Sequence, residues 1–370
     1  MKVTPVISNK IQDDNAGNQA SVIQTTQTTE TIPALQALQQ ERRRKGWLLG
    51  IIVMVSLLAI LISPMFGLTF MTPWDEGSQV IFWQMRVPRT LTAWIVGAGL
   101  SLAGLVFQAI LRNPLAEPFT LGVAAGASLG AAIYIYWGLT FTLGILSGIG
   151  LFAFLGAGII TLLIYSVNFR GGHSPLKLLL IGVILTFFVS SILMLLQSLG
   201  KSSSALAMMS WMMGRLSFVS FTELLQVAGI FVIVAGMVYQ MRVKLNLLQQ
   251  GEAVALSRGI RSQRVTGILF LGVSLMTGIF VAVTGPIGFI GMIIPHVARR
   301  LFGADHRWLF WATLFLGGLV LVIADTLGTL ILKPAEIPVG VVTAILGAPF
   351  FLYILLKGQK SAQFKAQKAK

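Results

Sequence analysis

Ten apolar stretches limit what this chain can fold into. Nine of them are about 20 residues long, the length that an α-helix needs to cross the roughly 30 Å hydrocarbon core of a bilayer. A tenth, about 287–301, is short and contains Pro295, so we expect a half-span or re-entrant helix there. The nine full-length stretches are about 47–65, 89–111, 119–137, 143–165, 176–199, 223–241, 265–285, 308–332 and 338–356.

The composition excludes a water-soluble globule. Charged residues make up 11% of the chain and apolar residues 55%, whereas about a quarter of a soluble domain is charged. The chain has no cysteine, which excludes disulfides, thiolate metal sites and a thiol nucleophile. We therefore predict an all-α polytopic protein of the cytoplasmic cell membrane, with about ten transmembrane crossings, one of them short.

The basic residues predict the orientation. The formal net charge is +15, lysine and arginine together number 27, and positive residues favour cytoplasmic loops. If the short stretch crosses, 22 of them lie on the side of the N-terminus and 5 on the other side. If it does not cross, the split is 15 to 12. The ten-crossing arrangement fits the rule better, and it places both termini in the cytoplasm.

The two ends of the chain differ from its middle. Residues 1–46 are rich in Gln, Thr, Asn and Ser and end in a basic cluster, which is typical of a disordered cytoplasmic tail rather than of a cleaved signal peptide. Residues 358–370 are also basic, and we interpret them as a second cytoplasmic tail. The membrane domain then extends over residues 47–357.

Residues that could support catalysis are sparse. The three histidines are scattered without the spacing of metal ligands, and no phosphate-binding loop is present, so we expect neither a metal site nor nucleotide hydrolysis by this chain. Asp325 is the one acidic residue well inside an apolar stretch. An ion-coupled carrier usually has several such acids, so Asp325 fits a functional role and a structural pairing about equally.

Glycines recur every four residues in one stretch, at positions 122, 126 and 130. Small residues on one helix face let two helices approach closely in lipid. We interpret this pattern as plain helix packing in a compact bundle.

Two segments outside the apolar stretches suggest contacts with partners. Arg86 and Arg89 lie three residues apart at the start of the second stretch, where arginines can bind carboxylates or extend to the membrane interface. In the longest cytoplasmic loop, residues 252–257 have a short helical pattern, and Gly259 is a natural stop. This helix is either a docking element or an ordinary interfacial helix.

A third segment, residues 284–296, contains three glycines and two prolines. Such a composition breaks helices, and irregular backbone at membrane depth must line a cavity or be covered by protein. The residues that we assign to this re-entrant segment are Gly285, Pro286, Gly288, Gly291, Pro295 and His296.

Together these segments resemble the FecCD-type permeases of iron–siderophore, haem and cobalamin ABC importers, over residues 47–357. Each motif alone is weak, but the five in this order and spacing are specific. They are Arg86-Val-Pro-Arg-Thr, Arg112-Asn-Pro-Leu-Ala-Glu-Pro-Phe-Thr-Leu-Gly122, Trp211-Met-Met-Gly214, Gly285-Pro-Ile-Gly-Phe-Ile-Gly-Met-Ile-Ile-Pro-His296 and Ala335-Glu-Ile-Pro-Val-Gly-Val-Val-Thr-Ala-Ile-Leu-Gly-Ala-Pro349.

The resemblance implies a transport permease and not an enzyme. Such a permease has ten crossings and forms a path with a second, identical or similar permease. Two ATPase subunits hold the ATP and magnesium, and an extracytoplasmic binding protein delivers the chelate. Ferric siderophore is the commonest cargo, with haem and cobalamin as alternatives. The resemblance implies no cofactor on this chain and no nucleic-acid partner.

The resemblance also assigns roles to individual residues. Residues 245–262 correspond to the segment that couples to the ATPase, and the stretch before Gly214 corresponds to a short helix at the outer gate. The coupling residues are Leu248, Gly251, Glu252, Ala253, Leu256, Gly259 and Ile260. The gate residues are Met208, Met209, Trp211, Met212 and Gly214.

The docking residues depart from the family at one position. Arg86 and Arg89 resemble the arginines that meet glutamates on the binding protein. Family members often have a further arginine four residues after the aspartate of the ninth crossing, but this chain has Thr329 there. Lys333, one turn further on, can supply the positive charge, and we include it as a third docking residue.

Overall fold

The computed structural model describes residues 36, 39–67, 69–75, 77, 79–143, 146–170, 175–216 and 219–368. The chain divides into two units, Met1–Ile51 and Ile52–Lys370. In the first unit, residues 39–51 are helical. Residues 39–46 of the predicted disordered tail are thus helical in the structure. An ion pair of 2.7 Å between Lys45 and Glu41, one turn apart, supports this helix. Most of the predicted tail lies outside the described residues.

The second unit is almost entirely helical. Its long helices are α3 (Val87–Leu111), α5 (Gly148–Arg170), α6 (Pro175–Leu199), α8 (Phe221–Gln250), α10 (Ser262–Thr284), α12 (His306–Ile331) and α13 (Val339–Lys368). The shorter ones are η1 (Ser63–Met65), α2 (Gln79–Ile81), η2 (Phe82–Arg86), α4 (Val123–Tyr136), α7 (Ser202–Met212), α9 (Glu252–Ser257) and α11 (Ile290–Phe302). The antiparallel strands β1 (Thr142–Leu143) and β2 (Leu146–Ser147) form one small ribbon.

Each of the ten predicted stretches contains a helix. In the described part of the chain, seven helices are long and apolar enough to cross a membrane, and α4 and residues 339–353 are shorter apolar helices. Two boundaries differ from the prediction. Helix α4, in the third predicted stretch, begins at Val123 rather than near residue 119, because Pro118 and the left-handed Gly122 precede it. The thirteenth helix continues to Lys368, so the predicted C-terminal tail begins as a helix.

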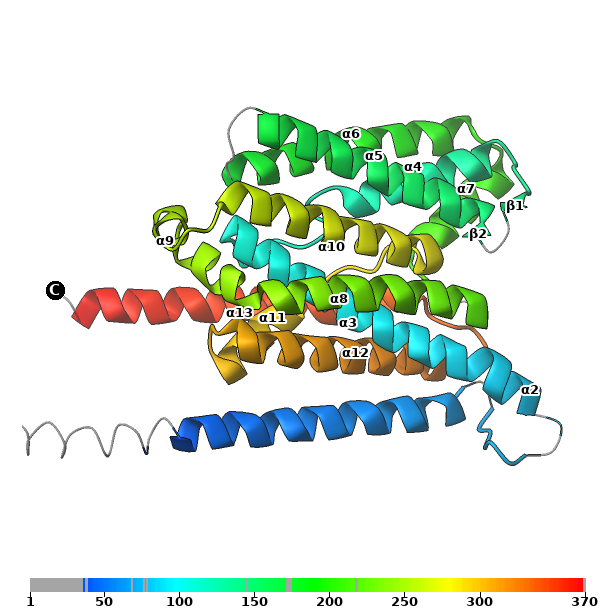
Figure 1. The fold of residues 1–370 in the computed structure, drawn as a ribbon. Coiled ribbons are helices and arrows are strands. Elements are labelled where there is room, and N and C mark those ends of the chain that lie inside the picture. Colours follow the sequence, from blue (N-terminus) through cyan, green and yellow to red (C-terminus); the bar gives the residue numbers. More distant parts are fainter. Residues whose placement is uncertain are drawn as a thin grey trace, which may run out of the picture. The chain divides into compact units, whose positions relative to one another are not determined.

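Helix α3 is the centre of the bundle. It packs against α12, α8, α11 and α10, and Figure 1 shows it passing between α12 and α10. Nearly every residue from Val96 to Leu111 is buried. A helix that is apolar and buried on all sides belongs to the interior, whereas α6 exposes large side chains such as Ile184 and Phe187. Such exposed apolar faces suit lipid or a second subunit.

The repeated glycines pack helices together, as predicted. Helix α4 lies against α5, where Gly126 faces Gly156 and each would place an added Cβ atom against the other's carbonyl oxygen. A side chain at either position would force the two backbones apart. The glycine repeat therefore defines the α4–α5 contact.

The short tenth stretch passes from one end of the bundle to the other. The carbonyl of Thr284, at the end of α10, accepts a hydrogen bond of 2.6 Å from the Arg215 backbone, and Arg215 lines the same cavity as Arg89. Beyond α11, the side chain of Asp305 accepts from Asn246, close to α9. We call these ends the Arg89 end and the α9 end. The ten-crossing count is thus supported, while the side of the membrane that each end faces stays a prediction.

Candidate functional site

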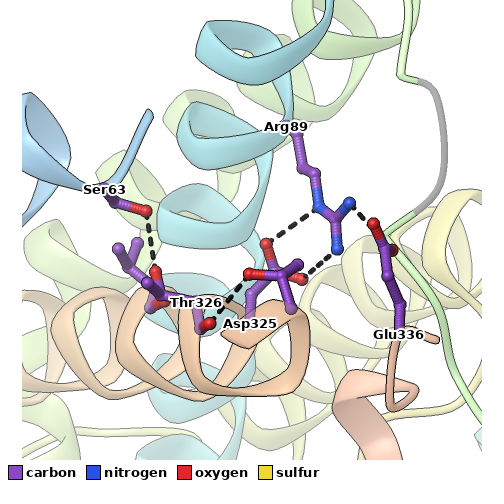
Figure 2. A network of polar contacts seen from close by, with 7 residues as sticks. Ser63, Arg89, Asp325, Thr326 and Glu336 are labelled. Carbon is purple, nitrogen blue, oxygen red and sulfur yellow. Dashed lines mark hydrogen bonds and ion pairs between the residues drawn. The ribbon is translucent and has the colours of Figure 1, made fainter. Parts of the chain in front are cut away.

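At the Arg89 end, one arginine joins three parts of the chain (Figure 2). Arg89 of α3 donates from Nε and Nη2 to both carboxylate oxygens of Asp325 in α12, at 3.0 and 2.9 Å. Its Nη1 donates to Glu336, in the turn before α13, at 3.1 Å. The geometry is the bidentate one that arginine favours with carboxylates. Asp325 is therefore paired within the protein, which is the structural alternative left open by the sequence.

Arg86 has a different role from Arg89. Its Nη1 donates to the carbonyls of Pro64 and Met65 at 3.2 and 3.3 Å, and its Nη2 donates to the carbonyl of Thr69 at 2.8 Å. A Cβ atom at Gly67 would lie 2.8 Å from Nη2, so a side chain there would displace the Arg86 guanidinium. Arg86 thus fixes η1 and the segment after it. Its positive charge is not neutralised by an acid, because these contacts are to neutral carbonyls.

A cavity of about 450 Å³ opens beside these arginines. Arg86, Arg89 and Arg215 line it together with Asp325 and Glu336. The predicted docking residues Arg86 and Arg89 are thus brought together, and Arg215 is a third basic residue there that the sequence did not single out.

Lys333 lies apart from this cavity. It is exposed, in the turn between α12 and α13, and it is not among the lining residues. Thr329, the position at which the resemblance led us to expect an arginine, does line the cavity. The predicted substitution of Lys333 for that arginine therefore does not place the charge in the same position, although Lys333 remains accessible to a partner.

The predicted gate helix α7 ends in a tight backbone junction. Gly214 has a φ of +68°, and an added Cβ would collide with the carbonyl of Pro286. The carbonyl of Gly214 accepts from the backbone of Gly340, at the start of α13, at 3.3 Å. Three of the motifs therefore meet in space: the end of α7, the break after α10 and the start of α13.

The predicted gate methionines do not share one environment. Met208 is buried, with 1% of its surface exposed. Met209 and Met212 are exposed, as is the neighbouring Met213, while Trp211 packs against the small-residue core of α4 and α5. Met208 is thus a packing residue, and the exposed methionines remain candidates for a surface that lines the path.

The re-entrant segment is broken at one of its two predicted places. Residues 285–289 are not helical, so the break at Gly285, Pro286 and Gly288 is confirmed. Pro295 does not end the helix but lies inside α11, which also contains Gly291 and His296. A proline has no N–H for the carbonyl four residues earlier, which here is that of Gly291.

Gln108 of α3 supplies the missing donor. This buried side chain donates from Nε2 toward the carbonyls of Gly291 and Met292, at 3.5 and 3.2 Å. Its Oε1 accepts a hydrogen bond of 2.6 Å from Arg299, one turn before the end of α11. Gln108 therefore connects α3 to the part of α11 that precedes Pro295 and offers a donor near the carbonyl that the proline leaves free.

The predicted coupling helix is present as α9. It begins after Gly251, whose φ is +131°, and it ends at a left-handed Gly259 with a φ of +73°. The N–H groups of Gly259 and Ile260 donate to the carbonyls of Leu256 and Ala255, both at 2.9 Å, which is a Schellman motif. The glycine stop is thus confirmed.

The surface of α9 is open. Glu252, Ala253 and Gly259 are exposed, and Leu256 exposes 58% of its surface. Leu248 is an exception among the predicted coupling residues, because its side chain is buried at the end of α8. It therefore positions α9 from behind and is not available as a contact for a partner.

Side chains at the α9 end tie α8 to the rest of the bundle. Asn246 donates from Nδ2 to Asp305 at 2.9 Å, and its Oδ1 accepts from the backbone N–H of His306 at 2.9 Å. Arg112 donates from Nε to the carbonyl of Leu248 at 3.1 Å. Burial alone would raise the pKa of Asp305, but hydrogen bonds from the Arg307 backbone and from Asn246 outweigh it and hold the pKa below its ordinary value.

Comparison with known proteins identifies the family of this arrangement. The model of the FecCD transport family matches residues 47–357, which is most of the chain. The chain belongs to the FecCD transport family. It is therefore a multi-pass permease of the cell membrane, of the kind used by ABC importers, and not itself an enzyme.

Relatives of this FecCD permease match along nearly their full length. The vitamin B12 import system permease of Klebsiella pneumoniae is 37% identical over 326 residues, covering 86% of this chain and 96% of that protein. The probable iron chelatin transport permease of Helicobacter pylori is 38% identical over 279 residues, covering 75% and 83%. A solved structure assigned to the metal-chelate type of ABC transporter, in an inward-facing conformation, matches with a TM-score of 0.77 and 30% identity, over 84% of this chain and 99% of that one.

A metal centre is not found in the described part of this FecCD permease. Among the residues that the structure describes, no three histidine, cysteine, aspartate or glutamate side chains lie together as metal ligands would.

Sequence reasoning missed Gln108, Asn246 and Glu336 as organising residues. Gln108 could have been found as a polar residue within the apolar run Val106-Phe107-Gln108-Ala109-Ile110. Asn246, near the end of α8, and Glu336, in the turn before α13, lie where polar side chains are common and give no such signal.

Proposed function

We propose that this permease forms the membrane path for a ferric chelate, with a ferric siderophore as the expected cargo. The match to the FecCD transport family over residues 47–357 carries this proposal, and the iron chelatin permease among the relatives supports the class of cargo. The partners are a second permease, identical or similar, two ATPase subunits that hold ATP and magnesium, and an extracytoplasmic binding protein. This chain needs no cofactor of its own.

The exposed helix α9 is the contact for the ATPase subunits in this proposal. It has a defined start and stop at two glycines, and Leu256 and Val254 give it an apolar surface that water would disfavour. Closure of the ATPase dimer moves α9, and α8 moves with it because the two helices are adjacent in the chain. The motion reaches α12 and α3 because Asn246 and Leu248 connect α8 to them. The bundle then changes between inward-open and outward-open states by rigid-body motion of its helices.

The path itself needs little affinity for the cargo. A chelate is bound mainly by the delivering protein, so the permease must release it rather than hold it. The exposed methionines Met209, Met212 and Met213 suit this task, because methionine adapts to irregular apolar shapes.

Transport in proteoliposomes tests this function. The permease is reconstituted with the ATPase subunits and the candidate binding protein, and uptake of radioactive iron as ferric siderophore is measured. We expect uptake that requires ATP, magnesium and the binding protein together. Uptake of the chelate driven by an ion gradient without the ATPase would contradict the proposal and favour an ion-coupled carrier.

Cobalamin is the second candidate cargo. The relatives named as vitamin B12 permeases cover 86 to 87% of this chain, more than the iron chelatin permease does. Labelled cyanocobalamin in the same proteoliposomes, with the corresponding binding protein, separates the two cargoes, and labelled haem is the third arm of that experiment.

A further inference from the structure

We propose that Arg215 is a docking residue for an acidic side chain of the protein that delivers the cargo, and that it connects this docking to the outer gate. The inference rests on the proposed function, because it assumes such a partner. The observation behind it is that Arg215 lines the cavity beside Arg86 and Arg89, although the motifs did not single it out.

The first step is the balance of charge in the cavity. Three arginines and two carboxylates line it, but Arg89 has both carboxylates as its own partners. Arg86 donates to backbone carbonyls, so its charge is not neutralised by an acid. The Arg215 side chain is exposed, and no hydrogen bond or ion pair of its guanidinium is found in the described part of the chain. Arg86 and Arg215 therefore have no acidic partner, and the three arginines and two carboxylates together leave the cavity with a formal charge of +1.

The second step is the chemistry of the occupant. A guanidinium binds a carboxylate through two parallel hydrogen bonds, which gives orientation as well as attraction. A cavity of about 450 Å³ that is open at the surface admits a side chain from a partner protein. Charge complementarity thus favours a glutamate or aspartate of that partner over an apolar group.

The third step is the position of Arg215 on the gate. Its backbone N–H donates to the Thr284 carbonyl at 2.6 Å, and the preceding Gly214 accepts from Gly340 at 3.3 Å. The base of this side chain is therefore fixed where α7, α10 and α13 meet. A carboxylate bound to Arg215 pulls directly on that junction, which a contact with Lys333, in the α12–α13 turn, does not.

Binding kinetics test the proposal. The permease is held in nanodiscs with its ATPase subunits, and the probe is the binding protein that supports uptake in the proteoliposome experiment. Arg215→Glu and Arg215→Gln are compared with Lys333→Glu as a matched exposed cation at the same end. We expect Arg215→Glu to lower the association rate constant about tenfold at low salt and to weaken its dependence on ionic strength, with a smaller effect for Arg215→Gln. Lys333→Glu is expected to have the smallest effect.

A charge reversal on the partner separates docking from a structural role. Glutamates of the binding protein are changed to arginine one at a time, and one of them should restore association with Arg215→Glu while weakening association with the wild type. Assembly with the ATPase subunits confirms that the variants are folded. Wild-type kinetics in both Arg215 variants, or a loss confined to Lys333→Glu, would overturn the role of Arg215. If no binding protein associates with the wild-type permease, the proposed function itself fails.

Discussion

The two ends of the bundle use different chemistry to hold their helices. At the Arg89 end, a cation lies between two carboxylates, and the partners Asp325 and Glu336 come from α12 and the following turn. At the α9 end, the cations Arg112 and Arg299 donate to neutral acceptors, the Leu248 carbonyl and the Gln108 amide. The Arg89 end thus has ion pairs besides the bonds of Arg86 to carbonyls, whereas these bonds at the α9 end each join a charged group to a neutral one.

This difference fits the two tasks that the proposed function gives to the ends. A partly buried ion pair is strong and directional, and removal of one partner leaves an uncompensated charge at a high energetic cost. A hydrogen bond to a carbonyl or an amide is weaker and can be exchanged for another at little cost. We therefore infer that the Arg89 end keeps one arrangement, while the α9 end can change partners when an ATPase moves α9.

The largest expected effect is at the ion pair. Asp325→Ala leaves Arg89 with one carboxylate instead of two and removes two hydrogen bonds, so we expect it to destabilise the fold by about 3 kcal/mol. Glu336→Ala removes one hydrogen bond and is expected to cost less than half of that. The midpoint of thermal unfolding in nanodiscs, at a fixed scan rate, measures both.

A double variant shows whether this cost belongs to the pair. In Arg89→Ala/Asp325→Ala both members of the pair are removed, and only Glu336 loses its partner, as it also does in Arg89→Ala. The loss should therefore be clearly smaller than the sum of the two single losses. Glu252→Ala, which removes an exposed acid, is the matched control for loss of a carboxylate. Additive losses in the double variant would mean that Arg89 and Asp325 are not coupled. The Arg89 end would then not be held by this ion pair, and the proposed difference between the two ends would fail.

The next effect concerns Gln108 and the proline in α11. Gln108→Ala leaves the Gly291 carbonyl, freed by Pro295, without its donor, and we expect a loss of about 2 kcal/mol. Pro295→Ala restores a backbone N–H at that position. It should therefore recover part of the loss in the Gln108→Ala background, and change stability little on its own.

The same thermal measurement separates this explanation from simple loss of packing. Gln108→Leu keeps most of the side-chain volume but lacks the amide. If Gln108→Leu is as stable as the wild type, the amide does not stabilise α11. If Pro295→Ala gives no recovery, the Gly291 carbonyl is not the group that Gln108 satisfies.

A smaller effect is expected where the α9 end transmits motion. Asn246→Ala removes the contacts from α8 to Asp305 and His306, so α9 can move without moving α12. We expect the ratio of cargo transported to ATP hydrolysed to fall roughly fivefold, which corresponds to a coupling of about 1 kcal/mol. Lys244→Ala, on the same stretch of α8, is the control, and an unchanged ratio in Asn246→Ala would count against transmission through this residue.

Sequence reasoning found the helices more reliably than it found their partners. A span or a glycine stop depends on residues close together in the chain, so the ten apolar stretches and the end of α9 at Gly259 could be predicted. The partner of Arg89 could not, because Asp325 lies 236 residues away and the pairing depends on how α3 packs against α12. Both residues were singled out, but for separate roles.

The same reason explains the interpretation of Pro295. Within the sequence alone it is a helix breaker, and the break at residues 285–289 agrees with the local rule. The helix continues through Pro295, and Gln108, on a different helix, donates toward the carbonyls of Gly291 and Met292 before it. Local rules fail in this protein where a side chain distant in sequence satisfies a backbone group.

The smallest effect tests the shape of α9 itself. Gly259 has open space around it, so Gly259→Ala introduces strain through its left-handed backbone alone, at a cost of about 1 kcal/mol, and should loosen the end of the helix. Gly259→Asn is the matched variant, because asparagine tolerates this conformation better. We expect association with the ATPase subunits to weaken in the order wild type, Asn, Ala. The midpoint of thermal unfolding, which depends on the ion pairs at the Arg89 end, should not change. An equal loss for Asn and Ala would show that the partner requires the absence of a side chain at residue 259, rather than the left-handed backbone conformation.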